Sequence, residues 1–146
     1  MFMKSICGDQ KPVGPYSPAV KLGDFVYVSG QLPLHENGEM DETIELQVHC
    51  ALDNLKKLLN SVNLEMRHIV KTTLFLTDMK DFEKVNEIYS EYFTEPYPAR
   101  SCVEVKALPK GAKFEIEALV IDTLVYENQM QSSCSCSEKN CGGCKQ

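Results

Sequence analysis

The chain is organised around the stretch Tyr97-Pro98-Ala99-Arg100-Ser101-Cys102-Val103-Glu104-Val105. Side chains alternate between the two faces of a strand, so Arg100, Cys102 and Glu104 are predicted to share one face. An arginine at the start of a strand can be an edge charge, or its planar guanidinium can grip a carboxylate through two hydrogen bonds. An internal ion pair of Arg100 with Glu104 or Glu115 is a further possibility.

Hydrophobic spacing on either side of this stretch predicts two amphipathic helices and four more strands. The helices are expected at residues 43–62 and 81–93, and the strands at 19–22, 25–29, 69–77 and 114–125. Residues 1–18 are predicted to be irregular, with Tyr16 held on a stiff loop by the prolines around it. This order predicts an α+β (mixed α/β) fold with one mixed sheet and two helices on one face.

Two helices can cover only one face of such a sheet. The other face also carries apolar residues, for example Leu119 and Ile121 in the last predicted strand. A single copy would leave these side chains in water, so we expect self-association to bury that face.

Composition limits the class of protein. The chain has 146 residues, 43% of them hydrophobic and 25% charged, which suits one soluble domain. The formal net charge is −6 and no basic run supplies a phosphate-binding stripe, so nucleic acid is not an expected partner. No apolar run approaches a membrane span and no signal peptide is recognisable, so we expect no membrane partner and a cytoplasmic location.

We divide the chain into a domain at residues 1–125 and a Cys-rich, flexible tail at residues 126–146. The domain shows no metal motif, because His35, His49 and His68 have no partner at ligand spacing, and no cofactor is expected. The tail contains Cys134, Cys136, Cys141 and Cys144. Four thiolates could enclose Zn²⁺, although the Cys-x-Cys spacing is tight, and a reduced tail or redox pairing are the alternatives.

Several short motifs together resemble the Rid (YjgF, reactive intermediate deaminase) family, and its RidA subfamily in particular. The resemblance covers about residues 4–122. It is carried by Gly14-Pro15-Tyr16-Ser17, Val28-Ser29-Gly30-Gln31, Val70-Lys71-Thr72-Thr73, Asp81-Phe82 with Val85-Asn86, residues 98–105 of the opening stretch, and Glu115-Ile116-Glu117-Ala118.

The resemblance implies a chorismate-mutase-like fold, a homotrimer with sites between subunits, and hydrolysis of 2-imino acids such as 2-iminobutanoate and 2-iminopropanoate to 2-keto acids and ammonia. Arg100 would bind the substrate carboxylate and the backbone carbonyl of Cys102 would orient the imine nitrogen. Glu115 would position water, and Tyr16 would close the cleft with a hydrogen bond. Ser29, Gly30 and Asn86 match family positions near the substrate.

Two other functions compete with this interpretation. Some proteins of this fold lack the arginine, so a non-catalytic binding or regulatory protein, in translation control or as a redox-activated holdase, is the alternative. The presence of Arg100 and Glu115 favours catalysis. Nuclease activity finds no support in the acidic charge or in a metal motif.

Overall fold

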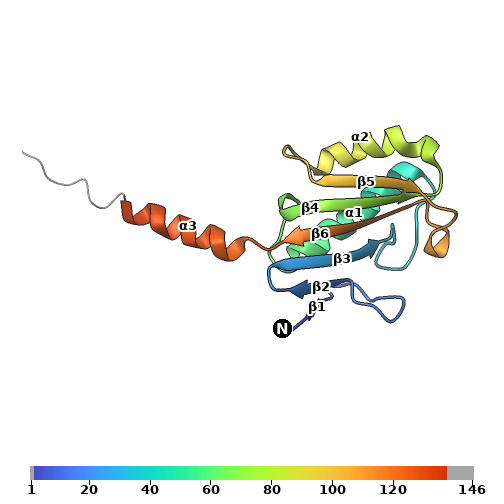
Figure 1. The fold of residues 1–146 in the computed structure, drawn as a ribbon. Helices are drawn as coiled ribbons and strands as arrows, with labels where there is room; N and C mark the ends of the chain where they lie inside the picture. The colour runs from blue at the N-terminus through green and yellow to red at the C-terminus, as the bar shows by residue number, and fades with distance from the viewer. Residues whose placement is uncertain (1, 138–146) are drawn as a thin grey trace, which may run out of the picture.

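The structure, a computed structural model, describes residues 2–137, with side chains described as far as Ser132. Its six strands form one mixed sheet in the order β1-β2-β3-β6-β4-β5, with β4 and β5 parallel and the other pairs antiparallel (Figure 1). The strands are β1 (Lys4–Ile6), β2 (Ala19–Leu22), β3 (Phe25–Gln31), β4 (Ile69–Leu76), β5 (Ala99–Glu104) and β6 (Phe114–Ile121). The helices are α1 (Ile44–Asn60), α2 (Phe82–Tyr92) and α3 (Leu124–Ser137).

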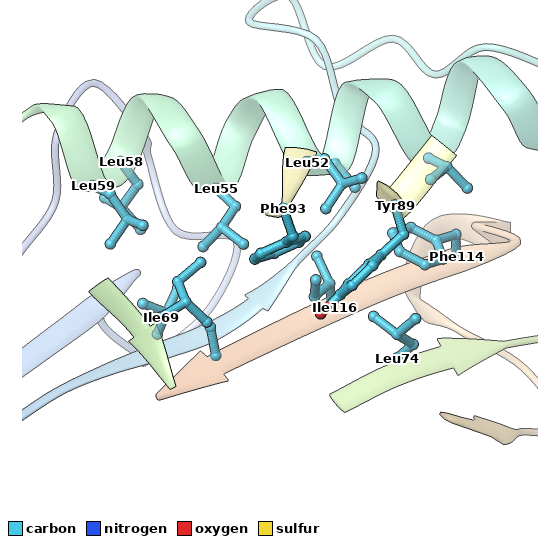
Figure 2. Close-up of a cluster of buried hydrophobic side chains, with 14 of the residues drawn as sticks. Leu52, Leu55, Leu58, Leu59, Ile69, Leu74, Tyr89, Phe93, Phe114 and Ile116 are labelled. Atoms are coloured by element: carbon cyan, nitrogen blue, oxygen red, sulfur yellow. The ribbon is translucent and has the colours of Figure 1, made fainter. Parts of the chain in front are cut away.

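Helices α1 and α2 pack on one face of this sheet, as the apolar spacing predicts. Thr43 begins α1 by accepting a hydrogen bond from the Leu46 amide. Leucines of α1 then pack against β4 and β6 in a continuous hydrophobic core (Figure 2). Its fully buried members include Leu52, Leu55, Leu59, Leu74, Phe114 and Ile116. The predicted α+β fold, with one mixed sheet and two helices on one face, is therefore confirmed.

Two parts of the chain differ from the sequence prediction. Strand β1 lies in the segment expected to be irregular, and at three mostly exposed residues it has no hydrophobic pattern to detect. The last strand ends at Ile121 rather than Val125, because Asp122 accepts a hydrogen bond from the Leu124 amide and α3 follows. Helix α3 carries no apolar stripe, which is why spacing does not reveal it.

Helix α3 projects away from the sheet (Figure 1) and is attached at its base. The Arg67 guanidinium donates two hydrogen bonds to the Glu127 carboxylate, both of 2.9 Å, and Tyr126 donates one to Asp24. The Arg67 pair holds the pKa of Glu127 at about 2, well below its usual range. Among the described residues, no helix is long and apolar enough to cross a bilayer.

The sheet face opposite α1 and α2, which we call the open face, carries large apolar side chains. Phe25 and Tyr27 of β3 are 47% and 50% exposed. They pair across the strands with Ile121 and Leu119 of β6, the two residues that the sequence places on this face. The expected apolar face is thus present, and in one copy of the chain its aromatic side chains are about half exposed.

Candidate active site

A pocket of about 420 Å³ lies where the loop before β2, the end of β3 and the start of β6 meet. It is lined by four residues that the sequence analysis selects: Tyr16, Ser29, Gly30 and Glu115. We call it the Glu115 pocket. These residues are far apart in the sequence, and the antiparallel pairing of β3 with β6 brings them together.

Glu115 points to the open face, because its neighbours Phe114 and Ile116 are fully buried in the core. Its side chain is half-buried, and no hydrogen bond or ion pair to it is found among the described side chains. Burial, and then the negative charge of Glu117, raise the pKa of the Glu115 carboxyl above its usual value. A desolvated carboxylate of this kind is suited to accept a proton from water.

Gly30 is required by the position of Glu115. A Cβ atom added at Gly30 would lie 2.1 Å from Oε1 and 2.7 Å from Cδ of Glu115. Carbon and oxygen atoms cannot approach so closely, so any side chain at position 30 would displace the carboxylate. The register of β3 against β6 also shifts between Val28 and Gln31, which places Ser29 and Gly30 in the irregular part of the strand.

The loop before β2 supplies Tyr16. The Tyr16 hydroxyl accepts a hydrogen bond from the Val13 amide at 3.4 Å, and the side chain is 46% exposed at the pocket. Ser29 is held in place by donating from Oγ to the Ser17 carbonyl at 2.7 Å. The hydroxyl groups of Tyr16 and Ser29 are thus both held at the edge of the pocket by hydrogen bonds to backbone atoms.

Arg100 lies on the other side of the sheet, facing α2. Its Cζ atom is 4.9 Å from the ring centroid of Tyr89 and 5.7 Å from that of Phe82. Such contacts stabilise a guanidinium by about 0.5–2 kcal/mol without using its N–H groups. No described carboxylate forms an ion pair with Arg100, and Glu104 instead accepts a hydrogen bond from the Met79 amide. The internal ion pairs that the sequence left open are thus not formed.

Two further predicted residues accompany Arg100. Cys102 shares its face of β5 and packs against the core, and burial raises the pKa of the thiol although Arg100 opposes the shift. A raised pKa disfavours the thiolate form and therefore a nucleophilic role. Asn86 lies on α2 at helical spacing from Phe82 and Tyr89. Its Oδ1 atom is buried without a hydrogen-bond partner among the described residues.

We call the second group, Phe82, Asn86, Tyr89, Arg100 and Cys102, the Arg100 cluster. Strand β4 separates it from the Glu115 pocket. Arg100 is registered with Thr72 of β4, which is buried under the helices, whereas Glu115 is registered with Phe75. Two strand spacings and three residues along the strand amount to roughly 14 Å between the Cα atoms. One copy of the chain thus does not bring its two main candidate residues together.

The sequence analysis missed three residues at these places. Phe82 and Tyr89 belong to the apolar spacing that predicts the helix at residues 81–93, and that spacing does not show that their rings support Arg100. Lys110 lines the Glu115 pocket from a turn in which its φ is +57°, and the Leu-Pro-Lys-Gly pattern is a signal for that turn but not for the pocket.

The possible metal ligands in the tail cannot be placed in the fold. Cys141 and Cys144 lie outside the described residues, as do the side chains of Cys134 and Cys136.

Comparison with known proteins identifies the class. The family model described as Endoribonuclease L-PSP matches residues 8–122. The chain belongs to this family, which is the Rid (YjgF) family.

Individual relatives carry different names. A 2-iminobutanoate/2-iminopropanoate deaminase of Escherichia coli is 42% identical over 124 residues, which cover 81% of this chain and 97% of the relative. The RutC family protein y4sK of Sinorhizobium fredii is 49% identical over 110 residues, covering 74% and 87%. The crystal structure of E. coli TdcF with bound serine superposes with a TM-score of 0.75 at 40% identity, covering 81% of this chain and 98% of that one.

Proposed function

We propose that the protein hydrolyses reactive 2-imino acids, such as 2-iminobutanoate and 2-iminopropanoate, to 2-keto acids and ammonia. The observation that carries the proposal is the Arg100 guanidinium, which is half-buried on two aromatic rings without a carboxylate partner among the described residues. A fixed, unpaired guanidinium is suited to bind a planar carboxylate through two charge-assisted hydrogen bonds. The relatives named as imine deaminases support the same reaction.

In the proposed reaction, Arg100 binds the substrate carboxylate and the Cys102 backbone carbonyl accepts a hydrogen bond from the imine nitrogen. Strand β5 is an edge strand, so part of its backbone is not used in the sheet. Glu115 accepts a proton from water as the water oxygen bonds to the imine carbon. The nitrogen is protonated in turn, and the resulting carbinolamine breaks its C–N bond to release ammonia and the keto acid.

The remaining predicted residues complete this site. Tyr16 would close the cleft and donate a hydrogen bond to the substrate. Ser29 and Gly30 would form the wall that sets the position of Glu115. Asn86 Oδ1, which has no hydrogen-bond partner among the described residues, would accept a hydrogen bond from a group in the assembled site.

The site is proposed to form between copies of the chain in a homotrimer. Two observations support this assembly. The Arg100 cluster and the Glu115 pocket lie on opposite sides of one sheet, and the open face exposes Phe25 and Tyr27 beside Leu119 and Ile121. Burying that face against a second copy would shield the apolar side chains, and would allow the Glu115 pocket of one copy to meet the Arg100 cluster of its neighbour.

Imines generated in situ by an amino-acid oxidase test the proposal, with release of 2-keto acid followed over time. Wild-type protein should accelerate release, and Arg100→Ala should reduce the acceleration by about 10² to 10³, the value of two hydrogen bonds to a charged group. Arg100→Lys keeps the charge but loses the planar fork, so we expect an intermediate loss. Arg67→Ala is the matched control, because Arg67 binds Glu127 at the base of α3.

Full acceleration by Arg100→Ala, with its oligomeric state unchanged, would contradict the assignment. The same preparations incubated with single-stranded RNA decide whether the nuclease named in the family description is present instead. Arg100-independent RNA cleavage without imine hydrolysis would replace the proposal.

A further inference from the structure

The Arg100 side chain is supported mainly by helix α2. Its own strand, β5, lies at the edge of the sheet and has β4 as its one neighbour among the described strands. Helix α2 presents the ring of Tyr89 at 4.9 Å from the guanidinium and the ring of Phe82 at 5.7 Å. Tyr89 is the nearer and the more deeply buried of the two, because only 6% of it is exposed whereas Phe82 is partly buried.

The Tyr89 ring is itself fixed in the core. Its hydroxyl lies 2.9 Å from Oγ1 of Thr72, a fully buried residue of β4. Its face stacks on Phe93 with the ring centroids 4.2 Å apart, and Figure 2 shows the two rings beside each other in the core. Thr72 is also the residue of β4 that is registered with Arg100. The hydrogen bond therefore ties the ring to the strand position next to the guanidinium that the ring supports.

We propose that Tyr89 is a positioning residue for Arg100, and that its buried hydrogen bond with Thr72 sets the direction in which the guanidinium presents its N–H groups. Neither Tyr89 nor Thr72 contacts the substrate, and both act through Arg100. The inference rests on the proposed function for the identity of the carboxylate that Arg100 binds. The order of the guanidinium in ligand-free protein does not depend on that function and is measured separately.

Bidentate binding explains why the direction of the guanidinium matters. Two parallel hydrogen bonds form only when the plane of the guanidinium matches the plane of the carboxylate. A free arginine side chain has many rotamers to lose on binding, and a support that orders it in advance lowers that cost. An aromatic ring can restrict the guanidinium while leaving its N–H groups free. The ring must not shift for this to work, and the contact with Thr72 supplies that restraint.

The charge state of Tyr89 is compatible with this role. Burial raises the pKa of the Tyr89 hydroxyl, although the hydrogen bond with Thr72 and the charge of Arg100 act in the opposite direction. The hydroxyl is therefore protonated near neutral pH. A phenolate would form an ion pair with Arg100 and compete with a substrate carboxylate, whereas a neutral ring leaves the positive charge available.

Tyr89→Leu removes the ring and the hydroxyl together. We expect the KM for the imine to rise about tenfold, with a smaller change in kcat, through loss of the cation–π contact and its ordering effect. Calorimetry should show the same factor in the Kd of the product 2-oxobutanoate. In ligand-free protein, the NMR order parameter of the Arg100 Nε–H group should fall. Tyr89→Phe keeps the ring, so its KM should rise only about threefold, and it carries the same test if Tyr89→Leu does not fold.

A double variant separates positioning from stability. Thr72→Val and Tyr89→Phe each leave the other hydroxyl unpaired in the core, so each should lower the free energy of unfolding. The double variant leaves neither hydroxyl unpaired and should regain stability. Its ring is still untethered, so its KM should stay as high as in the single variants. A KM that recovers together with stability would overturn the positioning role of the hydrogen bond.

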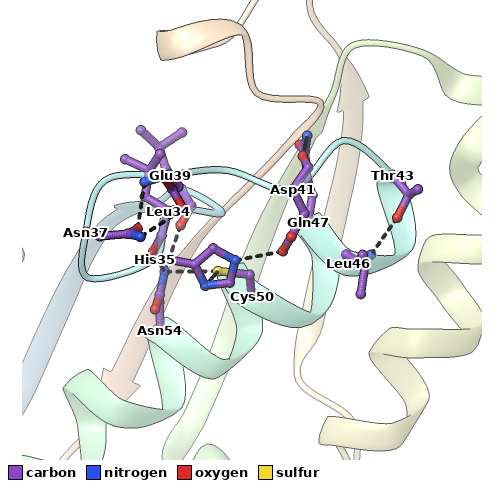
Figure 3. A network of polar contacts seen from close by, with 11 residues as sticks. Leu34, His35, Asn37, Glu39, Asp41, Thr43, Leu46, Gln47, Cys50 and Asn54 are labelled. Atoms are coloured by element: carbon purple, nitrogen blue, oxygen red, sulfur yellow. Dashed lines mark hydrogen bonds and ion pairs between the residues drawn. The ribbon is translucent and has the colours of Figure 1, made fainter.

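Two matched variants serve as controls. Tyr92→Phe removes a hydroxyl from the same helix, but one that donates to Asp53 and lies outside the Arg100 cluster. Thr43→Val removes the N-terminal cap of α1 (Figure 3) and lowers stability without touching that cluster. Both should leave the KM and the Arg100 order parameter unchanged. An equal order parameter in wild type and in the Tyr89 variants overturns the inference, whereas wild-type protein that hydrolyses no imine overturns the proposed function alone.

Discussion

The Arg100 cluster and the Glu115 pocket hold their central residues in opposite ways. Arg100 rests on two aromatic rings that leave its charge intact and its hydrogen-bond donors free. Glu115 lies in a pocket where burial and Glu117 work against its charge. The first arrangement suits a permanent charge that binds an anion, and the second suits a group that takes up a proton. In the proposed function each supplies half of the site, so the separation of the two within one chain makes assembly part of that proposal.

The largest effect on keto-acid release is expected when an intact Arg100 cluster and an intact Glu115 pocket are brought together from two different variants. Arg100→Ala and Glu115→Gln should each be nearly inactive alone, but co-assembled trimers should regain activity. In any mixed trimer one of the three sites receives both wild-type residues, so an equal mixture should reach about a quarter of the wild-type rate. Keto-acid release before and after mixing by refolding measures this. If mixing restores nothing, both residues act within one copy or the site has a different composition.

Gly30→Ala tests how closely Glu115 must be placed. The added methyl group would overlap Glu115 Oε1, so the carboxylate must move by an ångström or more. A displacement of that size typically lowers the rate by about 100-fold. We expect the loss in kcat with Arg100-dependent substrate binding retained, measured as a KM close to that of wild type. Wild-type kcat in this variant would show that Glu115 need not occupy its observed position.

Asn86→Ala should separate activity from stability. The variant removes a buried acceptor that has no partner in the part of the chain that the structure describes, and such a group costs about 1–3 kcal/mol when unpaired. The free energy of unfolding should therefore stay constant or rise, whereas imine hydrolysis should fall about tenfold through loss of one hydrogen bond to substrate. Denaturant unfolding and keto-acid release measure the two quantities. A parallel fall in both would make Asn86 a structural residue.

The smallest effect is expected from Glu117→Gln. Glu115 works as a base only when ionised, so kcat/KM should fall as the pH drops through its pKa. The Glu117 charge raises that pKa, and removing it lowers the pKa, so the acidic fall should move to lower pH with the maximum rate preserved. Lys56→Gln, on the exposed side of α1, is a charge-change control that should leave the profile in place. A shift to higher pH in Glu117→Gln would contradict the assignment of Glu115 as the base.

Most of the fold could be predicted because its elements bury one face each. The leucines of α1 and the alternation in β4 and β6 leave clear hydrophobic periods. Strand β1 is too short to show a period, and α3 is held by the Arg67–Glu127 contact and has no apolar stripe, so neither could be found from spacing.

For the candidate site, the resemblance to the Rid family predicts which residues take part but not how they are arranged in space. Alternation places Arg100 and Glu115 on faces of their own strands, but it does not give the order of strands or the offset along β4. That offset is set by the register of β4 with β5 on one side and with β6 on the other, which no local pattern announces. The unpaired oxygen of Asn86 and the overlap at Gly30 likewise require three-dimensional coordinates.

The contact between Gly30 and Glu115 also bears on how this family can diverge. The missing side chain at one position makes room for the carboxylate at the other, although 85 residues separate them in the chain. The two positions are therefore expected to covary among relatives, with a larger residue at position 30 accompanied by a shorter one at position 115. Relatives that have left catalysis should be recognisable by this paired exchange, even where the rest of the sheet is unchanged.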